Sequence, residues 1–167
     1  FSILTWAPPF AVRTYDVGIA KVGAIMGSGI AIVGGAAMIF AGIAADWVAR
    51  KSLAAAMGAM AAALSLSAVL IGVALYGGHF EIFAAAITLG YALLIAYSPL
   101  MWLILHKYSP ASMRATSASV MLLAINLFSA VPAPLLIGVT SDLARPYFGD
   151  RSLQVALGIA PAAVLTA

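Results

Sequence analysis

Long apolar runs, broken by only a few polar residues, restrict the fold of this chain more than any other feature. Residues 52–80, for example, contain no Asp, Glu, Lys or Arg. A helix of about 20 apolar residues crosses the hydrocarbon core of a membrane. Only 8% of the 167 residues are charged and 65% are hydrophobic, whereas a soluble domain has about 25% charged residues. The chain therefore cannot cover a water-facing surface, and its main solvent is lipid.

The polar breaks divide the chain into six candidate membrane-spanning helices. Strands are disfavoured, because an open sheet edge is costly in lipid and the runs are longer than barrel strands. Asp16 is a candidate N-cap for the second helix, and Gly77 and Gly78 would end the third. We predict an all-α membrane protein whose first and last helices are truncated. The helices are expected at residues 1–14, 17–46, 52–76, 81–106, 112–141 and from 152 onward.

The charged residues limit the partners of the chain. The eight Lys and Arg residues occur singly or in pairs, which suits membrane edges and argues against a nucleic-acid-binding patch. The absence of Cys excludes disulfides and thiolate metal sites. His79 and His106 lie at predicted membrane edges, far apart in the sequence, so we expect no metal site and no cofactor. Lys and Arg divide equally between the two predicted sides, so they do not orient the chain.

A short motif occurs twice. The segments "GIAADWVAR" at 42–50 and "GVTSDLAR" at 138–145 both end an apolar helix with Gly-x-x-x-Asp, followed by Arg. They belong to the second and fifth predicted helices, the middle members of two successive triplets. An odd number of crossings separates them, so they are expected on opposite sides of the membrane. This is the arrangement of two inverted three-helix repeats, which is typical of secondary transporters.

Asp46 needs a reason, because an acid near the C-terminal end of a helix opposes the helix dipole. Arg50 follows at the favourable i,i+4 spacing. We interpret Asp46 as half of a gate latch, which contacts the N-terminus of a neighbouring helix in one conformation. Gly42, one turn earlier, would let that helix approach. The alternative is a solvated ion pair with Arg50, worth about 0.3–0.5 kcal/mol and without a gating role. The sequence leaves both readings open.

At this point the chain resembles the major facilitator superfamily. Its loop signature Gly-x-x-x-Asp-Arg/Lys-x-Gly-Arg-Lys/Arg is matched at Gly42, Asp46, Arg50 and Lys51, although Trp47 and Ala49 replace a basic residue and a glycine. The segment "TWAPPFAVRTY" resembles the end of a seventh helix in that family. A second segment, from Ser109 to Leu143, resembles an eleventh helix and includes Arg114, Gly138 and Asp142, with Arg145 just beyond it. The similarity to the superfamily covers essentially the whole chain. The similarity to its spinster-like and organic-anion permease branches is weaker than that to the superfamily as a whole.

The resemblance implies a secondary carrier. Residues 1–167 would form the C-terminal six-helix half, helices seven to twelve, of a twelve-helix protein that moves a small organic solute or lipid-like molecule by alternating access. The missing N-terminal half would supply the helix end that faces Asp46. A proton or another ion is a candidate coupling partner, and we expect a bacterial inner membrane as the location. Arg50, Lys51, Lys107 and Arg114 would face the cytoplasm, and Arg145 and Arg151 the outside.

The resemblance places the fourth predicted helix beside the substrate. On that helix Thr88, Tyr91, Ser98 and Trp102 share one face, and such rings and hydroxyls can stack on a ligand and bond to it. We favour Tyr91 and Ser98 for the cavity, and a membrane interface or helix contact for Trp102, near the helix end. Pro99 should kink the helix, because it has no N–H for the carbonyl four residues back.

Two further polar or amphipathic residues are candidate substrate contacts. Asn126 is the most polar side chain of the fifth predicted helix and needs a partner in lipid, for which a bond to another helix is the commoner outcome. Trp6 lies on the first predicted helix, which the resemblance also places beside the cavity. No Asp, Glu, Lys, Arg or His falls centrally in a full span. A coupling carboxylate is therefore expected in the missing half, unless the carrier is a facilitator.

Two other functions stay open. A non-catalytic assembly subunit would use stripes of small residues to bind other helices, and one such stripe comprises Gly23, Gly27, Ala31 and Gly35. An intramembrane serine hydrolase would need a base within reach of Ser28 in the Gly-Ser-Gly at 27–29. Both histidines are expected at membrane edges, so we expect no enzyme.

Overall fold

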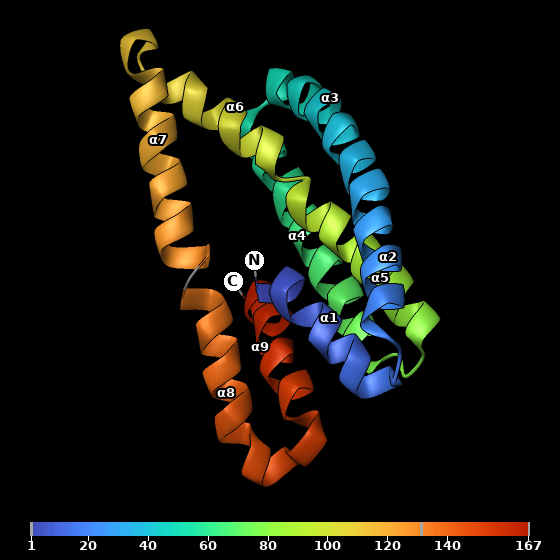
Figure 1. Ribbon diagram of the computed structural model, residues 1–167. Helices are drawn as coiled ribbons and strands as arrows, with labels where there is room; N and C mark the ends of the chain where they lie inside the picture. Colours follow the sequence, from blue (N-terminus) through green and yellow to red (C-terminus); the bar gives the residue numbers. More distant parts are fainter. Residues whose placement is uncertain (1, 131, 167) are drawn as a thin grey trace.

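A computed structural model describes residues 2–130 and 132–166, except for the side chains at 49, 51, 53, 160 and 163–166. These residues are almost entirely helical and include no strand. In chain order (Figure 1) the elements are α1 Ser2–Tyr15, α2 Ile19–Gly29, η1 Ile30–Gly34, α3 Gly35–Lys51, α4 Leu53–Tyr76, α5 Phe80–Ile95, α6 Ser98–Tyr108, η2 Ala111–Met113, α7 Arg114–Ile125, η3 Asn126–Ala130, α8 Pro132–Phe148, η4 Gly149–Arg151 and α9 Ser152–Thr166.

Four helical stretches among the described residues are long and apolar enough to cross a membrane. They are Ile19–Val48, Ala54–Tyr76, Phe80–Tyr108 and Ala111–Ile159. The shortest has 23 residues, which at about 1.5 Å per residue exceeds the roughly 30 Å of a hydrocarbon core. The predicted all-α membrane class is confirmed at this level. Six separate spans and their division into two repeats remain predictions.

Three predicted helix boundaries are wrong. Asp16 does not cap the second helix, because it lies in the α1–α2 link with φ 49° and Gly18 immediately precedes α2. Asp tolerates this left-handed conformation better than most residues. The second predicted helix corresponds to α2, η1 and α3. It continues to Lys51, so Asp46 lies inside its last turns. The fifth continues to Phe148, past Asp142.

Three irregular stretches interrupt the long helices. The first lies at 96–97, between α5 and α6, immediately before Ser98 and Pro99. The interruption lies where Pro99 was expected to disturb the helix, since the proline ring cannot donate to the preceding turn; a bend of the helix axis stays a prediction. The other two, η1 and η3, are π-helical segments of five residues each. A π-helical segment inserts one extra residue into a helix and occurs frequently at functional sites.

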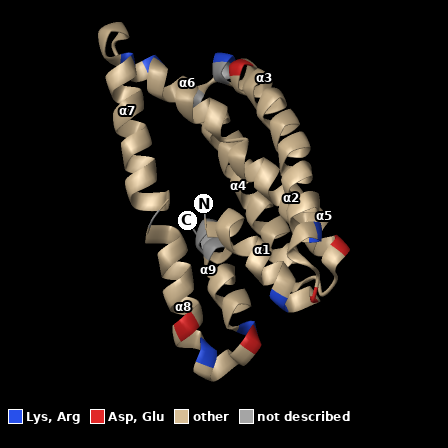
Figure 2. Cartoon of the chain, viewed as in Figure 1, with Lys and Arg blue, Asp and Glu red and all other residues tan. Residues whose placement is uncertain are grey.

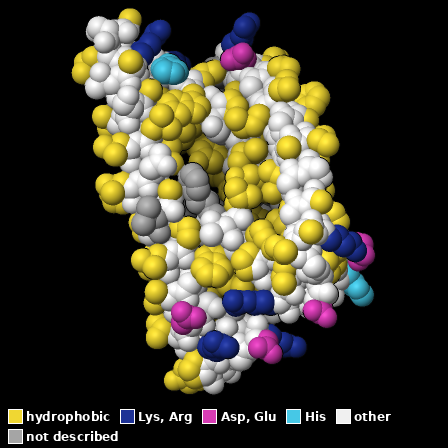
Figure 3. All heavy atoms as spheres, in the orientation of Figure 1, with side chains coloured by type: hydrophobic (Ala, Val, Ile, Leu, Met, Phe, Trp, Pro, Cys, Tyr) yellow, Lys and Arg dark blue, Asp and Glu magenta, His cyan; other side chains and the backbone are white. Residues whose placement is uncertain are grey.

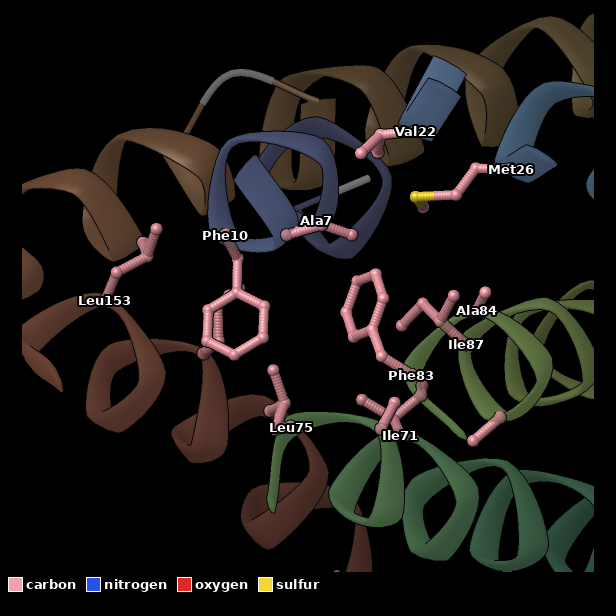
Figure 4. Close-up of a cluster of buried hydrophobic side chains, with 14 of the residues drawn as sticks. Ala7, Phe10, Val22, Met26, Ile71, Leu75, Phe83, Ala84, Ile87 and Leu153 are labelled. Atoms are coloured by element: carbon pink, nitrogen blue, oxygen red, sulfur yellow. The ribbon is translucent and has the colours of Figure 1, made fainter. Parts of the chain in front are cut away.

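The core lies where α1, α4, α5 and α9 meet (Figure 4). Phe10 of α1 and Phe83 of α5 are fully buried, with ring centroids 5.6 Å apart. Two hydrogen bonds tie α4 to its neighbours: Ser67 Oγ donates to the Gly90 carbonyl over 2.6 Å, and Gln154 Nε2 donates to the Leu75 carbonyl over 2.7 Å. Such interhelical bonds hold helices together where lipid offers no hydrophobic driving force.

Charged residues lie at the two ends of the bundle (Figure 2). One end holds the C-terminus of α3 and the α6–α7 link, and the other holds the α1–α2, α4–α5 and α8–α9 links. Asp46 lies near the first end and Asp142 near the second. The two copies of the Gly-x-x-x-Asp motif thus lie at opposite ends of the bundle.

Candidate functional site

A cavity of about 540 Å³ lies between α3, α5, α6, α7 and η3. Figure 3 shows a hollow on the face between α7 and α3, surrounded by hydrophobic side chains. Its wall is mainly aliphatic and aromatic, with the hydroxyls of Ser98 and Ser129 among the polar groups. A volume of about 300–1,000 Å³ and a mostly apolar wall with a few polar groups are typical of small-molecule sites.

The structure brings together three of the four residues predicted on the fourth helix. Tyr91, Ser98 and Trp102 all line the cavity. Trp102, which was expected at a membrane interface or helix contact, lines the cavity and stacks on His106, with ring centroids 6.2 Å apart. Thr88 is buried elsewhere, against Gly29 of α2. A Cβ at Gly29 would lie 3.1 Å from Thr88 Oγ1, so this threonine belongs to a helix contact.

Several cavity residues were missed by the sequence analysis. Tyr97 precedes the Ser-Pro pair in the break between α5 and α6, and Ser129 lies in the π-helical segment η3. Met38 and Met101 complete the wall from α3 and α6. The only sequence signal was the proximity of Tyr97 to Pro99 and of Ser129 to Asn126.

The other two candidate substrate contacts lie elsewhere. Trp6 Nε1 donates to the Pro134 carbonyl of α8 over 3.0 Å, which ties α1 to α8. Asn126 was expected to bond to another helix, but its Nδ2 donates to the Leu122 carbonyl of its own helix over 2.8 Å. One amide hydrogen is thereby bonded within its own helix, and no interhelical bond of Asn126 is present among the described residues.

The first copy of the motif presents an open surface. Asp46 and Arg50 are both exposed, and no ion pair joins them in the described part of the chain. A surface pair contributes too little to hold two long exposed side chains in one geometry. A Cβ at Gly42 would meet no atom within 4 Å. Arg114 is exposed at the start of α7, and the Lys51 side chain lies outside the described residues.

The second copy of the motif lies beside a polar pocket of about 470 Å³ at the other end of the bundle. Asp142 and Arg145 line it together with Arg13 of α1 and Asp150 of η4. Gly138, one turn earlier, lies beneath the Trp6 ring. The two copies therefore differ in their surroundings: the second contacts α1, and the first faces open space.

Ser28, the candidate hydrolase nucleophile, donates to the Ala24 carbonyl of its own helix over 2.7 Å. This is the ordinary state of a serine inside a membrane helix. No base contacts it among the residues that the structure describes.

Comparison with known proteins gives no match: no family model, no curated protein and no solved structure is significantly similar to this chain.

Proposed function

We propose that this chain is one half of a secondary carrier, built from two inverted three-helix repeats in the manner of the C-terminal half of a major facilitator protein. Its substrate would be a small organic solute, moved by alternating access at a cavity shared with a second six-helix half. A bacterial inner membrane is the proposed location. The observation that carries the proposal is a structural register common to the two middle helices.

That register joins each π-helical segment to its motif. Ile30, the first residue of η1, lies twelve residues before Gly42, and Asn126, the first residue of η3, lies twelve residues before Gly138. Well under about 1% of residues in soluble proteins are π-helical. Two such segments at the same distance from the same motif therefore favour a common structural unit over coincidence.

The contacts between helices support the same reading. In two inverted triplets, α4 and α9 would be equivalent and would meet near the pseudo-two-fold axis, and they do contact each other. The contact of α2 and α3 with α5 and α6 would correspond to that of α8 with α1, and both are present. Each middle helix thus touches the first helix of the other triplet.

The cavity and the exposed first copy of the Gly-x-x-x-Asp motif suggest how the carrier would work. Solute would bind at Tyr91, Ser98 and Trp102, beside the break at Pro99 that lets the helix bend. Asp46, with Gly42 beneath it, would latch to the second half in one conformation and release it in the other. Among the described residues, no Asp, Glu, Lys, Arg or His lines this cavity, so a coupling group would come from the second half.

A second candidate is a non-catalytic assembly subunit. All four residues of the stripe Gly23, Gly27, Ala31 and Gly35 are exposed, and a Cβ at any of its three glycines would meet no atom within 4 Å. Such a face accepts another helix closely. It serves a carrier half equally well, because a second half must dock somewhere. The cavity favours the carrier.

Cysteine labelling in cells tests the inverted arrangement, and the chain has no native Cys to interfere. Asp46→Cys and Asp142→Cys are produced separately and treated with a membrane-impermeant maleimide from outside. We expect only Asp142→Cys to react, and Asp46→Cys to react after the membrane is permeabilised. Reaction of both from the same side would contradict the two inverted repeats and the carrier built on them.

A further inference from the structure

All five polar side chains in the cavity wall lack a hydrogen-bond partner among the described residues. They are Tyr91, Tyr97, Ser98, Trp102 and Ser129, and they come from α5, the 96–97 break, α6 and η3. Each carries a donor, and the four hydroxyls also accept. The cavity therefore presents a set of unused hydrogen-bonding groups in an otherwise apolar wall.

Several hydroxyl and indole groups elsewhere in the bundle are hydrogen-bonded. Ser67 donates to another helix, and the Trp6 indole does the same. Ser28, Ser119 and Thr140 each donate to a carbonyl of their own helix. This back-bonding is the usual state of hydroxyls in membrane helices, where water is scarce. Ser98 and Ser129 make no such bond among the described residues, and both line the cavity.

The charge of the wall restricts what can bind. In the part of the chain that the structure describes, no Asp, Glu, Lys, Arg or His lies in it. A charged ligand would lose its hydration there without gaining a counter-ion, which is costly in a medium of low polarity. Arg50, Lys107 and Arg114 lie at the end of the bundle that holds the C-terminus of α3 and the α6–α7 link. A cation that entered from this end would therefore also meet repulsion.

The shape of the wall restricts it further. Tyr91, Tyr97 and Trp102 offer ring faces on which a flat apolar molecule can stack. Met38 and Met101 line the same space and adapt to the outline of a ligand. Oxygen acceptors on the ligand would use the free hydroxyl and indole donors.

We infer that the cavity binds an uncharged, flat aromatic solute that carries one or two oxygen acceptors, such as an aromatic ketone. The inference rests on the proposed function in one respect, namely that this cavity is the carrier's substrate site. It excludes organic anions, organic cations and hydrocarbon chains as the preferred occupant.

Binding to the protein in lipid nanodiscs tests the class of ligand. Four naphthalene probes of similar size are compared: methyl naphthyl ketone, naphthoate, naphthylmethylammonium and ethylnaphthalene. Empty nanodiscs measure partition into lipid. We expect saturable binding of the ketone, and binding at least about tenfold weaker for the two ions and for the hydrocarbon. The ions would lose hydration without gaining a counter-ion, and the hydrocarbon would leave the hydrogen-bonding groups of the site unpaired. Absence of saturable ketone binding, or equally tight binding of either ion, overturns the inference.

Removal of the free hydroxyls tests the site itself. The double variant Ser98→Ala/Ser129→Ala should bind the ketone about tenfold more weakly and ethylnaphthalene unchanged. Ser119→Ala, which removes a hydroxyl already bonded to its own helix, is the matched control and should leave both unchanged. Displacement of the ketone by a long-chain alcohol at equal concentration would identify a lipid tail as the occupant and overturn the inference. Binding is measured without transport. If the cysteine labelling contradicted the proposed carrier, the binding result would still apply to the cavity.

Discussion

The indole ring of Trp6 covers Gly138 where α1 meets α8. A Cβ built on Gly138 would lie 3.1 Å from Trp6 Cζ2, while Trp6 Nε1 donates to the Pro134 carbonyl one turn earlier. The glycine of the second motif thus makes room for a ring from another helix. Gly42, the glycine of the first motif, faces open space in the described chain. Under the proposed function, the second half of the carrier would fill that space.

Replacing Gly138 by Leu should destabilise the contact of α1 with α8. The new side chain would displace the indole and break its hydrogen bond, at a cost of about 1–3 kcal/mol in the free energy of unfolding. Gly138→Ala should be nearly neutral, because the better helix propensity, about 1 kcal/mol, offsets the closer contact. Titration with sodium dodecyl sulfate in mixed micelles, followed by circular dichroism, measures both. Gly42→Leu is the matched control; if it destabilised the chain equally, the contact with Trp6 would not be the reason.

Replacing Ser67 by Ala should loosen α4 from α5. The hydroxyl is fully buried and donates to the Gly90 carbonyl over 2.6 Å, and a bond of this kind contributes about 0.5–1.5 kcal/mol. The same titration measures the loss. Ser119→Ala removes an exposed hydroxyl bonded within its own helix and should change the free energy of unfolding by less. An equal loss in both variants would show that the interhelical bond contributes nothing of its own.

The sequence predicted the helices and the position of the break near Pro99 because both have local causes. Apolar runs long enough to span lipid become helices, and Pro99 breaks a hydrogen bond wherever it occurs. The shared face was drawn too wide. At about 100° per residue, Thr88 lies about 80° from Ser98 on a continuous helix, whereas Tyr91 lies only about 20° from it. Thr88 consequently packs against Gly29 while Ser98 lines the cavity.

The π-helical segments hid the rest of the site. An inserted residue shifts the helical phase, so Ser129, inside η3, could not be assigned to a face by counting from Asn126. No residue pattern in either segment announces the insertion. The shared register of η1 and η3 was accordingly invisible in the sequence, although the motif twelve residues downstream of each was plain.

Replacing Pro99 by Ala should join α5 and α6 into one straight helix. The restored N–H can donate to the Ile95 carbonyl, which removes the cause of the break. Spin labels on cysteines at Leu89 and Tyr108, both exposed, report the change by pulsed electron paramagnetic resonance. We expect their separation to increase toward the roughly 28 Å of a straight helix, at about 1.5 Å per residue. Pro110→Ala, in the link before η2, should leave it unchanged; an unchanged separation in Pro99→Ala would show that tertiary contacts impose the bend.

Replacing Asp46 by Ala tests whether this residue acts as a gate latch or is only a surface charge. If Asp46 holds the second half of the carrier at the end of the bundle where α3 terminates, Asp46→Ala should favour the state that is open at that end. In the full-length protein carrying Ser98→Cys, we expect the cavity thiol to react about tenfold faster with a maleimide applied from the cytoplasmic side, which corresponds to about 1.4 kcal/mol in the gating equilibrium. Arg50→Ala should have little effect, since no ion pair joins these two residues among those described. Asp150→Ala, at the other end, is the matched acid control. An unchanged rate in Asp46→Ala, at equal amounts of protein in the membrane, would reduce Asp46 to a solvated surface charge.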